Sequence, residues 1–326
     1  MSVYTKITNG ELDLHLKNYS LGKIIKFSGI SEGIENSNYL LNTESGDFIL
    51  TIFEAISADR VVNYLSFMNH VNNKGLLSPL VIETNDGELF KNIKNKPAAL
   101  IQKLEGKSIT QPANEHCAQL GKVLAGFHSC GSDFSLENTN TKIRNSRGGV
   151  WVEEAFEKLK DVIDAHQLKL IERAIEFRQY LFSQKKSLLP LPAGMIHADL
   201  FRDNILFFKN KISGIIDFYY SFHGPYIYDL AVVANDWCNQ KNSSLDKERL
   251  KSLITEYKKI RKITSEEKVV WKPALVTAAL RFYLSRLIDL HYPKIGELTH
   301  IKDPSIFENI LTVSYTHLTL PTICSV

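Results

Sequence analysis

The sequence predicts an α+β fold of two lobes, in which a small lobe built on an antiparallel sheet precedes a larger, mainly helical lobe. Short apolar runs alternate with turns over residues 20–110, which is typical of strands. After Gly106 the apolar residues recur at helical spacing over much longer stretches. We therefore expect the small lobe at residues 1–104 and the large lobe at residues 105–313.

The small lobe is expected to contain four strands and one helix. Ser57 fits an N-cap, apolar residues follow it at helical spacing, and Gly75 would end the helix. The strand-like runs are separated by turn residues. We expect the strands at Leu21–Phe27, Asn38–Leu41, Phe48–Phe53 and Leu100–Leu104.

The large lobe is expected to consist of long amphipathic helices. Each has one apolar stripe, because apolar side chains recur three and four residues apart. Pro273 comes early enough to lie in the first turns of the last helix, where a proline is tolerated. The stripes are Cys117–Phe127, Val152–Ile163, Leu170–Ile175 and Leu250–Tyr257, and the stretch Val269–Leu290 consists almost entirely of helix-forming residues.

The composition favours a globular protein without a nucleic-acid or membrane partner. A chain of 326 residues with 44% hydrophobic content can bury a large core. The net charge of +3 is mild, and we interpret the basic cluster at 258–262 as the solvated face of a helix. The chain has neither the core of a signal peptide nor an apolar run of about 18 residues, so we expect a cytoplasmic protein.

The four cysteines, Cys117, Cys130, Cys238 and Cys324, are scattered and form no CxxC pair. This spacing does not match a metal site. Three of them lie in apolar stretches with a helical pattern, so we expect those three to be buried free thiols.

The most informative segment is His197–Asn204. Asp199 follows the histidine by two residues, Asn204 follows Asp199 by five, and a second carboxylate, Asp217, comes after two short apolar runs. This is the layout of a kinase catalytic loop and its metal-binding aspartate. In that chemistry one carboxylate accepts a proton from the attacking hydroxyl. A carboxamide and another carboxylate hold magnesium against the phosphates.

The two apolar runs between these residues predict a hairpin. Ile205–Phe208 and Ile212–Ile216 are strand-like and are joined by the turn Lys209–Lys211. A hairpin of this size returns the chain to its starting point, so we expect Asn204 and Asp217 to converge as metal ligands.

A metal-dependent hydrolase is the main competing interpretation. Its ligands would be His197, Asp199, Asp217 and His223. Asn204 would then have no task, which favours phosphoryl transfer.

The catalytic segment resembles the Brenner-type motif of the aminoglycoside phosphotransferase and choline kinase superfamily, which has a protein-kinase-like fold. Further phrases resemble homoserine kinases of that superfamily, and the resemblance runs from near residue 4 to about residue 312. These phrases are Met195–Phe207, Ile216–Tyr220, Tyr228–Ala231, Asn235–Cys238, Gly33–Tyr39, Leu50–Glu54 and Asn145–Gly148.

The resemblance implies an ATP-dependent kinase that phosphorylates L-homoserine to O-phospho-L-homoserine in threonine biosynthesis, with Mg²⁺ as cofactor. Asp199 would accept the hydroxyl proton, and Arg202 could hold the transferring phosphoryl group or a carboxylate. His197 and Asp229 would brace the catalytic loop as structural supports. Two alternatives stay open: another acceptor alcohol (an aminoglycoside, choline or methylthioribose), or a nucleotide-binding pseudokinase.

Two further segments are candidates to bind ATP. The loop Ser28–Asn38 contains two glycines and several small polar residues, which suits a loop that folds over phosphates. Ser37 and Asn38 are its best-placed side chains. Gln102–Gly106 resembles the link between lobes, where backbone groups of Gln102 and Leu104 would pair with adenine.

One position departs from the kinase pattern. A kinase small lobe carries a lysine or arginine on its third strand to hold the phosphates. The expected position here is Thr51, and homoserine kinases of this type look similar. Phosphate charge must then be handled by other means. Glu54 is a candidate, by proximity alone, for the glutamate that pairs with such a lysine.

The acceptor would need a cation if it carries a carboxylate. Arg144, Arg147 and Arg202 are the candidates, because a guanidinium fork matches a carboxylate in two hydrogen bonds. Tyr219 and Tyr220, with Tyr226, follow the metal aspartate and are expected to line the acceptor pocket. A tyrosine-rich rather than acidic stretch favours a small acceptor with its own carboxylate over a cationic one.

The last thirteen residues, 314–326, lack helical periodicity and match nothing in the resembled family. We expect a frayed or non-native tail there. The sequence carries no signal for the oligomeric state.

Overall fold

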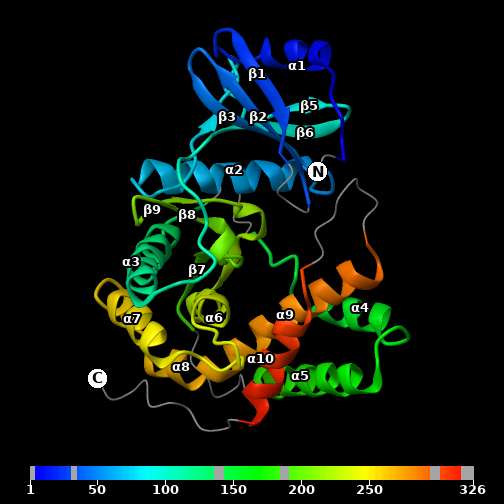
Figure 1. The fold of residues 1–326 in the computed structure, drawn as a ribbon, viewed down its shortest axis with the longest axis vertical. Coiled ribbons are helices and arrows are strands. Elements are labelled where there is room, and N and C mark those ends of the chain that lie inside the picture. Colours follow the sequence, from blue (N-terminus) through cyan, green and yellow to red (C-terminus); the bar gives the residue numbers. More distant parts are fainter. Residues whose placement is uncertain (1–3, 31–34, 136–142, 184–190, 294–301, 317–326) are drawn as a thin grey trace.

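The computed structural model describes residues 4–30, 35–135, 143–183, 191–293 and 302–316 and has two lobes (Figure 1). The small lobe is built on a sheet, and the large lobe is mainly helical. The predicted α+β architecture is therefore confirmed. The last strand of the small lobe ends at Gln102 and the next helix begins at Asn114, so the predicted boundary after Leu104 falls in the connection between them.

The sheet of the small lobe has six antiparallel strands. Its order is β1-β2-β3-β6-β4, with β5 paired to β6. The strands are β1 (Ile24–Gly29), β2 (Ser37–Thr43), β3 (Gly46–Ile52), β4 (Val81–Ile82), β5 (Lys91–Ile93) and β6 (Lys96–Gln102).

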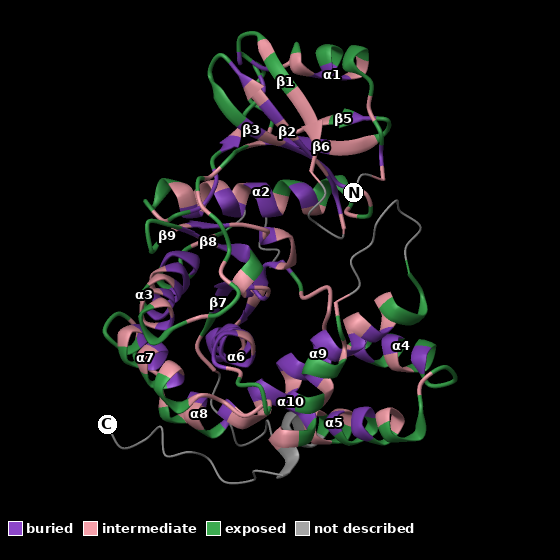
Figure 2. Cartoon of the chain, in the orientation of Figure 1, coloured by how far each residue is buried: buried purple, intermediate pink, exposed green. Residues whose placement is uncertain are grey.

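One face of this sheet forms a small core of its own. Strand β2 alternates between buried and half-buried residues along its length, as a strand with period two must when one face is covered. Tyr39 and Leu41 from β2 meet Leu50 from β3 in this core. Helix α1 (Asn9–Leu16) covers them with Leu12, and Figure 2 shows the buried residues on the strands.

Helix α2 (Ala58–Asn73) lies between the sheet and the large lobe in Figure 1. The helix predicted between Ser57 and Gly75 is thus confirmed, and Gly75 has the left-handed φ of 78°. Its side chains Val61 and Leu65 belong to the main core of the molecule, which is otherwise built largely by the large lobe. The helix therefore ties the two lobes together.

The sequence did not predict α1, β4 or β5. Helix α1 begins with a capping box, in which Thr8 N donates to Glu11 Oε2 (2.8 Å) and Glu11 N donates to Thr8 Oγ1 (3.3 Å). This Thr-x-x-Glu pattern was readable in the sequence. Strands β4 and β5 have two and three residues, which is too short for any periodicity.

The large lobe carries eight helices and four short strands within the described residues. The helices are α3 (Asn114–Gly131), α4 (Gly149–Leu159), α5 (Ala165–Ser183), α6 (Tyr226–Trp237), α7 (Lys247–Lys258), α8 (Ser265–Val269), α9 (Trp271–His291) and α10 (Ser305–Thr316). The strands are β7 (Ala193–Ile196), β8 (Ile205–Phe208), β9 (Lys211–Ile215) and β10 (Phe222–Pro225).

Helix α9 is the central helix of this lobe. It packs against α4, α5, α6 and α10, and it is buried around much of its circumference. Pro273 is its third residue, so the prediction that this proline lies in the first turn is confirmed. A helix surrounded in this way can carry a side chain into the centre of the lobe.

The predicted boundary of the C-terminal tail is wrong by three residues. Helix α10 continues through Ser314 to Thr316, because its apolar face packs on the lobe. Phe307 is 1% exposed and stacks on Phe282 of α9 with ring centroids 5.3 Å apart. Residues 317–326 lie outside the described residues.

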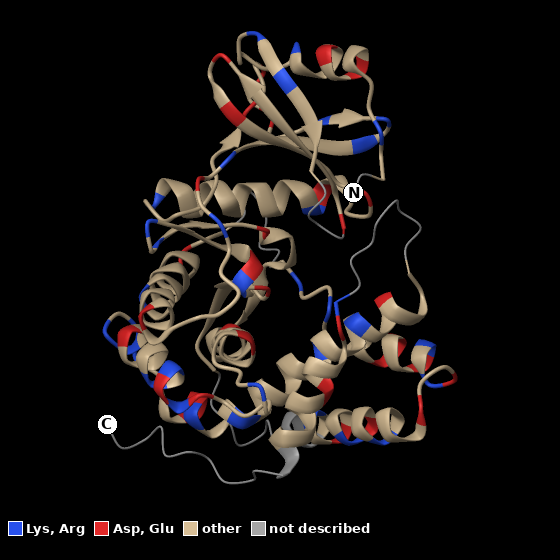
Figure 3. Cartoon of the chain, viewed as in Figure 1, with Lys and Arg blue, Asp and Glu red and all other residues tan. Residues whose placement is uncertain are grey.

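The interpretation of the basic cluster at 258–262 as a solvated face is wrong for Arg261. Its guanidinium lies 2.7 Å from the fully buried Glu267 and 4.5 Å from the ring of Tyr226. Elsewhere Lys and Arg alternate with Asp and Glu over the helices of the large lobe (Figure 3).

Two other expectations can be compared with the structure. Cys117, Cys130 and Cys238 are buried free thiols, as predicted, and Cys324 lies outside the described residues. Within the described ranges, the helices are too short or too polar to cross a membrane.

Gly121→Ala should destabilise the protein, whereas Gly126→Ala on the same helix should not. A Cβ at Gly121 would lie 2.1 Å from the carbonyl oxygen of Leu253, so α3 and α7 would have to separate at a cost of roughly 1–3 kcal/mol. At Gly126 the nearest atom, in Leu76, is 3.5 Å away. Alanine there should increase the free energy of unfolding by about 0.5–1 kcal/mol, because it favours the helix over glycine. Urea unfolding of both variants measures this, and equal midpoints would contradict the close approach.

Candidate active site

The predicted hairpin after the catalytic loop is present. Strands β8 and β9 pair antiparallel, and Lys209 and Asn210 form the turn with φ of 48° and 61°. Two positive φ angles are those of the tight turn that matches the twist of a hairpin. Ile216 N donates to the carbonyl oxygen of Asn204 (3.0 Å), which closes the hairpin at its open end. Asn204 and Asp217 are therefore brought together, as predicted.

Asp199 is held by side chains from two different elements. Asn204 Nδ2 donates to its backbone carbonyl (2.7 Å) and to Oδ2 (3.1 Å). Arg281 Nη1, from α9, donates to Oδ1 (3.2 Å). Arg281 was not among the predicted site residues, because it lies inside an apolar helix with no motif around it.

Asp199 and Asp217 are half-buried carboxylates with raised pKa values. Burial raises the pKa of Asp199 to about 7, although the positive charge of Arg281 opposes the shift. Burial and repulsion from Asp199 raise the pKa of Asp217 to about 8. Two carboxylates that repel one another in a desolvated site attract a cation strongly.

The side-chain oxygens of Asn204 and Asp217 fit a hard divalent cation. Asn204 and Asp217 offer one carboxamide and one carboxylate oxygen, and Mg²⁺ commonly takes one or two protein ligands beside waters and phosphate oxygens. No described part of the chain groups three or more His, Cys, Asp or Glu side chains in a metal-binding arrangement. The ligand set of the competing hydrolase interpretation is therefore not assembled.

His197 lies where a loop-bracing residue should lie. Burial lowers its pKa to about 4, so the ring is neutral. Its Nε2 donates to the carbonyl oxygen of Ile216 (3.0 Å), and its Nδ1 accepts from Asp199 N (3.3 Å). Both ring nitrogens are thus engaged with the backbone on either side of the site. This geometry agrees with the predicted structural role.

Asp229, on α6, binds the backbone at the start of the same loop. Its carboxylate accepts the backbone N–H groups of His197 (2.9 Å) and Ala198 (2.8 Å) and a third bond from His128 Nε2 (3.1 Å). Burial would raise the pKa of Asp229, but the hydrogen bonds and the nearby histidines lower it below its usual range. Ala198 has a φ of 65°, a conformation that is costly for alanine. The two hydrogen bonds of the carboxylate stabilise it.

Arg202 is occupied away from Asp199. Its Nε and Nη2 donate to the two carboxylate oxygens of Asp236 (3.1 and 3.0 Å), and Nη1 donates to the carbonyl oxygen of Thr110 (2.5 Å). A fork paired in this way ties the catalytic loop to α6 and to the segment before α3. The geometry therefore favours a structural role and gives no support to the predicted catalytic one.

The predicted nucleotide-binding side chains of the small lobe are also engaged internally. The Ser37 hydroxyl accepts from Tyr4 N (2.8 Å) and Thr5 N (2.9 Å) and donates to Glu54 (2.5 Å). Asn38 accepts a hydrogen bond from the Thr51 hydroxyl (2.8 Å). Part of the predicted phosphate loop, residues 31–34, lies outside the described residues.

Glu54 pairs with Lys96 of β6, which also donates to the Thr5 hydroxyl (2.9 Å). Glu54 is therefore a brace of the sheet edge in this structure. Glu54 cannot pair with a cation at the expected position on the third strand, because that position is Thr51. The lysine of β6 could not have been found from the sequence, because it follows a turn and fits no motif.

The predicted adenine link follows β6 directly. Gln102 donates its backbone N–H to the carbonyl oxygen of Leu80 (2.8 Å), so a pairing with adenine at this residue would use its carbonyl. Leu104 is half-buried. Gly106, with φ of 127°, approaches the hairpin so closely that a Cβ would lie 2.5 Å from Ser213 Oγ. This contact sets the link against the catalytic hairpin.

Arg144 and Arg147, two of the arginines proposed to bind the acceptor, differ in burial and contacts. Arg144 is exposed, whereas Arg147 is half-buried and lies 4.7 Å from the Trp151 ring. Arg147 Nη2 donates to the Tyr220 hydroxyl (3.2 Å) and lies 3.6 Å from Glu35. Its Nε is buried and has no hydrogen-bond partner among the described residues.

The three tyrosines after Asp217 have different surroundings. Tyr220 faces Arg147 and donates its hydroxyl to Glu35. Tyr219 packs edge-on against Phe53 of the small lobe, with ring centroids 4.9 Å apart. Tyr226 stacks on His128 in the core. Of these three tyrosines, only Tyr220 contacts an arginine proposed to bind the acceptor. The geometry therefore supports a place in the acceptor pocket for Tyr220 and not for the other two.

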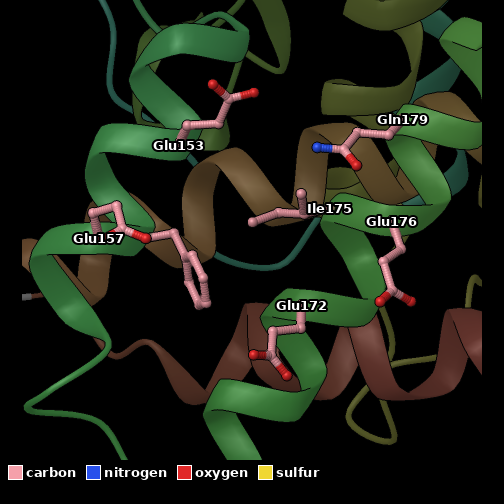
Figure 4. Close-up of a pocket in the computed structure, with 7 residues that line it drawn as sticks. Glu153, Glu157, Glu172, Ile175, Glu176 and Gln179 are labelled. Atoms are coloured by element: carbon pink, nitrogen blue, oxygen red, sulfur yellow. The ribbon is translucent and has the colours of Figure 1, made fainter.

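A hollow of about 320 Å³ lies between α4 and α5, away from these residues (Figure 4). Figure 4 shows glutamates from both helices around a partly apolar floor. None of its lining residues belongs to the catalytic loop or the hairpin.

Comparisons with known proteins agree with this site. The model of the phosphotransferase enzyme family matches residues 26–263. The homoserine kinase of Methylobacillus flagellatus is 39% identical over 311 residues, which cover 95% of this chain and 94% of that protein. The homoserine kinase of Neisseria meningitidis is 37% identical, covering 95% of this chain and 99% of that protein.

A solved structure supports the fold independently. The amicoumacin kinase hAmiN, in complex with AMP-PNP, Ca²⁺ and Ami, aligns with a TM-score of 0.72 over 94% of both chains at 14% identity. At that identity the likeness concerns the fold, and it confirms the predicted kinase-like architecture. Together with the family match, these findings show that the chain belongs to the phosphotransferase enzyme family and is an ATP-dependent small-molecule kinase.

Proposed function

We propose that this kinase transfers the γ-phosphoryl group of ATP to the hydroxyl of L-homoserine and forms O-phospho-L-homoserine, a step of threonine biosynthesis. The observation that carries the proposal is the placement of Asp199. Its carboxylate lies beside Asp217 and is held by Asn204 and Arg281. The guanidinium groups of Arg281 and Arg147 both lie against the ring of Tyr220. The relatives named homoserine kinase match over nearly the whole chain.

Asp199 would orient the acceptor hydroxyl and take its proton. The hydroxyl oxygen forms a bond to the γ-phosphorus while the bond from that phosphorus to the bridging oxygen breaks, and ADP leaves with the electron pair. The proton passes to an Asp199 carboxylate oxygen. Positioning and charge neutralisation dominate this reaction, so Asp199 needs only modest basicity.

Asn204 and Asp217 would hold Mg²⁺ in this proposal. The ion, when bound, neutralises charge on the β- and γ-phosphate oxygens. The two residues bring a carboxamide and a carboxylate to the same end of the hairpin. The raised pKa of Asp217 reflects the burial that a cation would offset.

Arg147 is the best candidate for the acceptor carboxylate. Arg144 is exposed and Arg202 is paired with Asp236, whereas Arg147 has a buried Nε without a partner beside Tyr220. Glu35, which lies on the same tyrosine, is the nearby anion for the acceptor ammonium. An acceptor with both charges matches this pair.

The charges also separate this proposal from its alternatives. Arg281 and Arg147 lie 4.6 and 5.6 Å from the Tyr220 ring, next to Asp199, which disfavours a cationic acceptor such as choline or an aminoglycoside. The glutamate-rich hollow between α4 and α5 contains none of these residues. A pseudokinase would not need the intact set Asp199, Asn204 and Asp217.

Asp199→Asn should abolish most turnover while leaving ATP binding nearly intact. The amide keeps the size of the side chain and can still bond to neighbours, but it cannot take the proton. General bases contribute about 10²–10⁴-fold to rate, so kcat should fall by that factor. Steady-state kinetics with a separate ATP-binding measurement test this. Retention of more than about a tenth of wild-type kcat would contradict the role of Asp199.

Asp217→Ala should raise the Mg²⁺ concentration needed for half-maximal activity and lower kcat. The variant loses one of the two proposed protein ligands, so the triphosphate charge is neutralised less well. Asp203→Ala is the matched control, because Asp203 directly precedes Asn204 in the catalytic loop but is exposed and pairs with Lys302. Titration of activity with Mg²⁺ measures both. The assignment fails if the two variants share the wild-type Mg²⁺ dependence.

Arg147→Ala should raise KM for L-homoserine by about 10–100-fold, the range expected from losing a charge-assisted hydrogen bond. KM for ATP should change much less. Arg144→Ala, three residues away and exposed, is the control and should behave as wild type. Homoserinol, which lacks the carboxylate, should be a poor substrate that hardly distinguishes the variants.

The panel that decides the acceptor contains L-homoserine, choline, methylthioribose and an aminoglycoside. L-Homoserine should give the highest kcat/KM with the wild type. A higher value for choline or the aminoglycoside would refute the acceptor while the kinase assignment stands.

A further inference from the structure

Arg281 is a buried cation in the middle of the longest helix of the large lobe. It is 5% exposed, and its neighbours on α9 include Leu280, Phe282 and Leu284, all buried. Arginine is almost never buried in this way unless it is paired, because desolvation of the charge is costly. The structure therefore requires a specific partner for this guanidinium.

Its partner is the candidate base. Arg281 Nη1 donates to Asp199 Oδ1 at 3.2 Å, and this is the one hydrogen bond that the guanidinium makes within the described residues. Asn204 holds the other oxygen, Oδ2, at 3.1 Å. The two carboxylate oxygens are thus held by separate residues, one on α9 and one directly before β8.

Aromatic rings hold the guanidinium in place. It lies 3.8 Å from the ring centroid of Phe282 and 4.6 Å from that of Tyr220. Cation–π contacts of this kind restrict the plane of the guanidinium, which is otherwise free to turn on its long side chain. Tyr220 is itself fixed by hydrogen bonds to Arg147 and Glu35. The direction of the Nη1–H bond toward Asp199 is therefore defined by packing.

We propose that Arg281 is a positioning residue for catalysis, which orients the Asp199 carboxylate so that its free lone pair meets the acceptor hydroxyl. The proposal rests on the kinase function proposed above. Without Arg281 the carboxylate would keep only its bond from Asn204 and could rotate about its side-chain torsions. A displacement of about 1 Å at a reacting group can cost on the order of 10²-fold in rate.

Arg281 should therefore act on kcat and through Asp199. Arg281→Ala should lower kcat by about 10²-fold with little change in KM for ATP. Arg281→Lys keeps the charge but not the stacked fork, so it should retain more kcat than alanine. Arg286→Ala is the control on the same helix. Arg286 stacks on Phe307 and donates to the Asp303 carbonyl (2.7 Å), so its loss should lower the melting temperature and leave kcat within about twofold.

A double-mutant cycle separates positioning from a general structural effect. In the Asp199→Asn background, adding Arg281→Ala should lower the residual kcat by less than about threefold, because the group that Arg281 orients is already lost. If Arg281→Ala lowers kcat by about threefold or more in the Asp199→Asn background as well, Arg281 acts independently of the Asp199 carboxylate and the proposal is overturned. Circular dichroism confirms that each variant is folded.

Two arrangements keep the test decisive. If Arg281→Ala does not fold, the kinetic test is made with Arg281→Lys instead. A wild-type kcat in the lysine variant would then overturn the proposal. The assay uses whichever alcohol of the panel the wild type phosphorylates fastest. A failure of the homoserine assignment then shows in the wild type alone, and a failure of the Arg281 proposal shows in the cycle.

Discussion

The buried carboxylate of Asp229 is the constraint on which the catalytic loop depends. It accepts two successive backbone N–H groups, from His197 and Ala198, and so holds Ala198 in a left-handed conformation that its side chain disfavours. That bend directly precedes Asp199, whose carboxylate is held by Asn204 and Arg281. His128 completes the shell of the carboxylate and is itself held by Tyr257 (2.7 Å). The site is therefore anchored in the core through polar bonds as well as packing.

From this anchor the site is built outward by charge compensation. Desolvation raises the pKa values of both Asp199 and Asp217, repulsion from Asp199 raises that of Asp217 further, and Arg281 offsets part of the charge of Asp199. Arg202 is paired with Asp236 of α6, and this ion pair stabilises the catalytic loop. The cations that remain near the acceptor side are Arg147 and Arg281. Their position explains why an acceptor with a carboxylate suits this kinase better than a cationic one.

Local sequence patterns predicted the elements whose signals are local. The hairpin after Asn204 follows from two strand-like runs and a turn, and α2 follows from its apolar spacing between Ser57 and Gly75. Strands β4 and β5 escaped because two or three residues carry no period. The roles expected for Ser37 and Arg202 lack geometric support, since each side chain found a partner that is distant in sequence. A side chain's hydrogen-bond partner is a property of packing and is not written in its neighbours.

The sequence by itself determined the two-lobed fold class, the kinase chemistry and the order of Asp199, Asn204 and Asp217, because a loop, a hairpin and their spacing are short-range features. Only the tertiary structure decided which arginine serves which carboxylate. Arg281 is 82 residues from Asp199 and lies in an apolar helix that gives no hint of a polar task. The packing of α9 in the centre of the lobe brings the two together, and that placement depends on contacts from the whole chain.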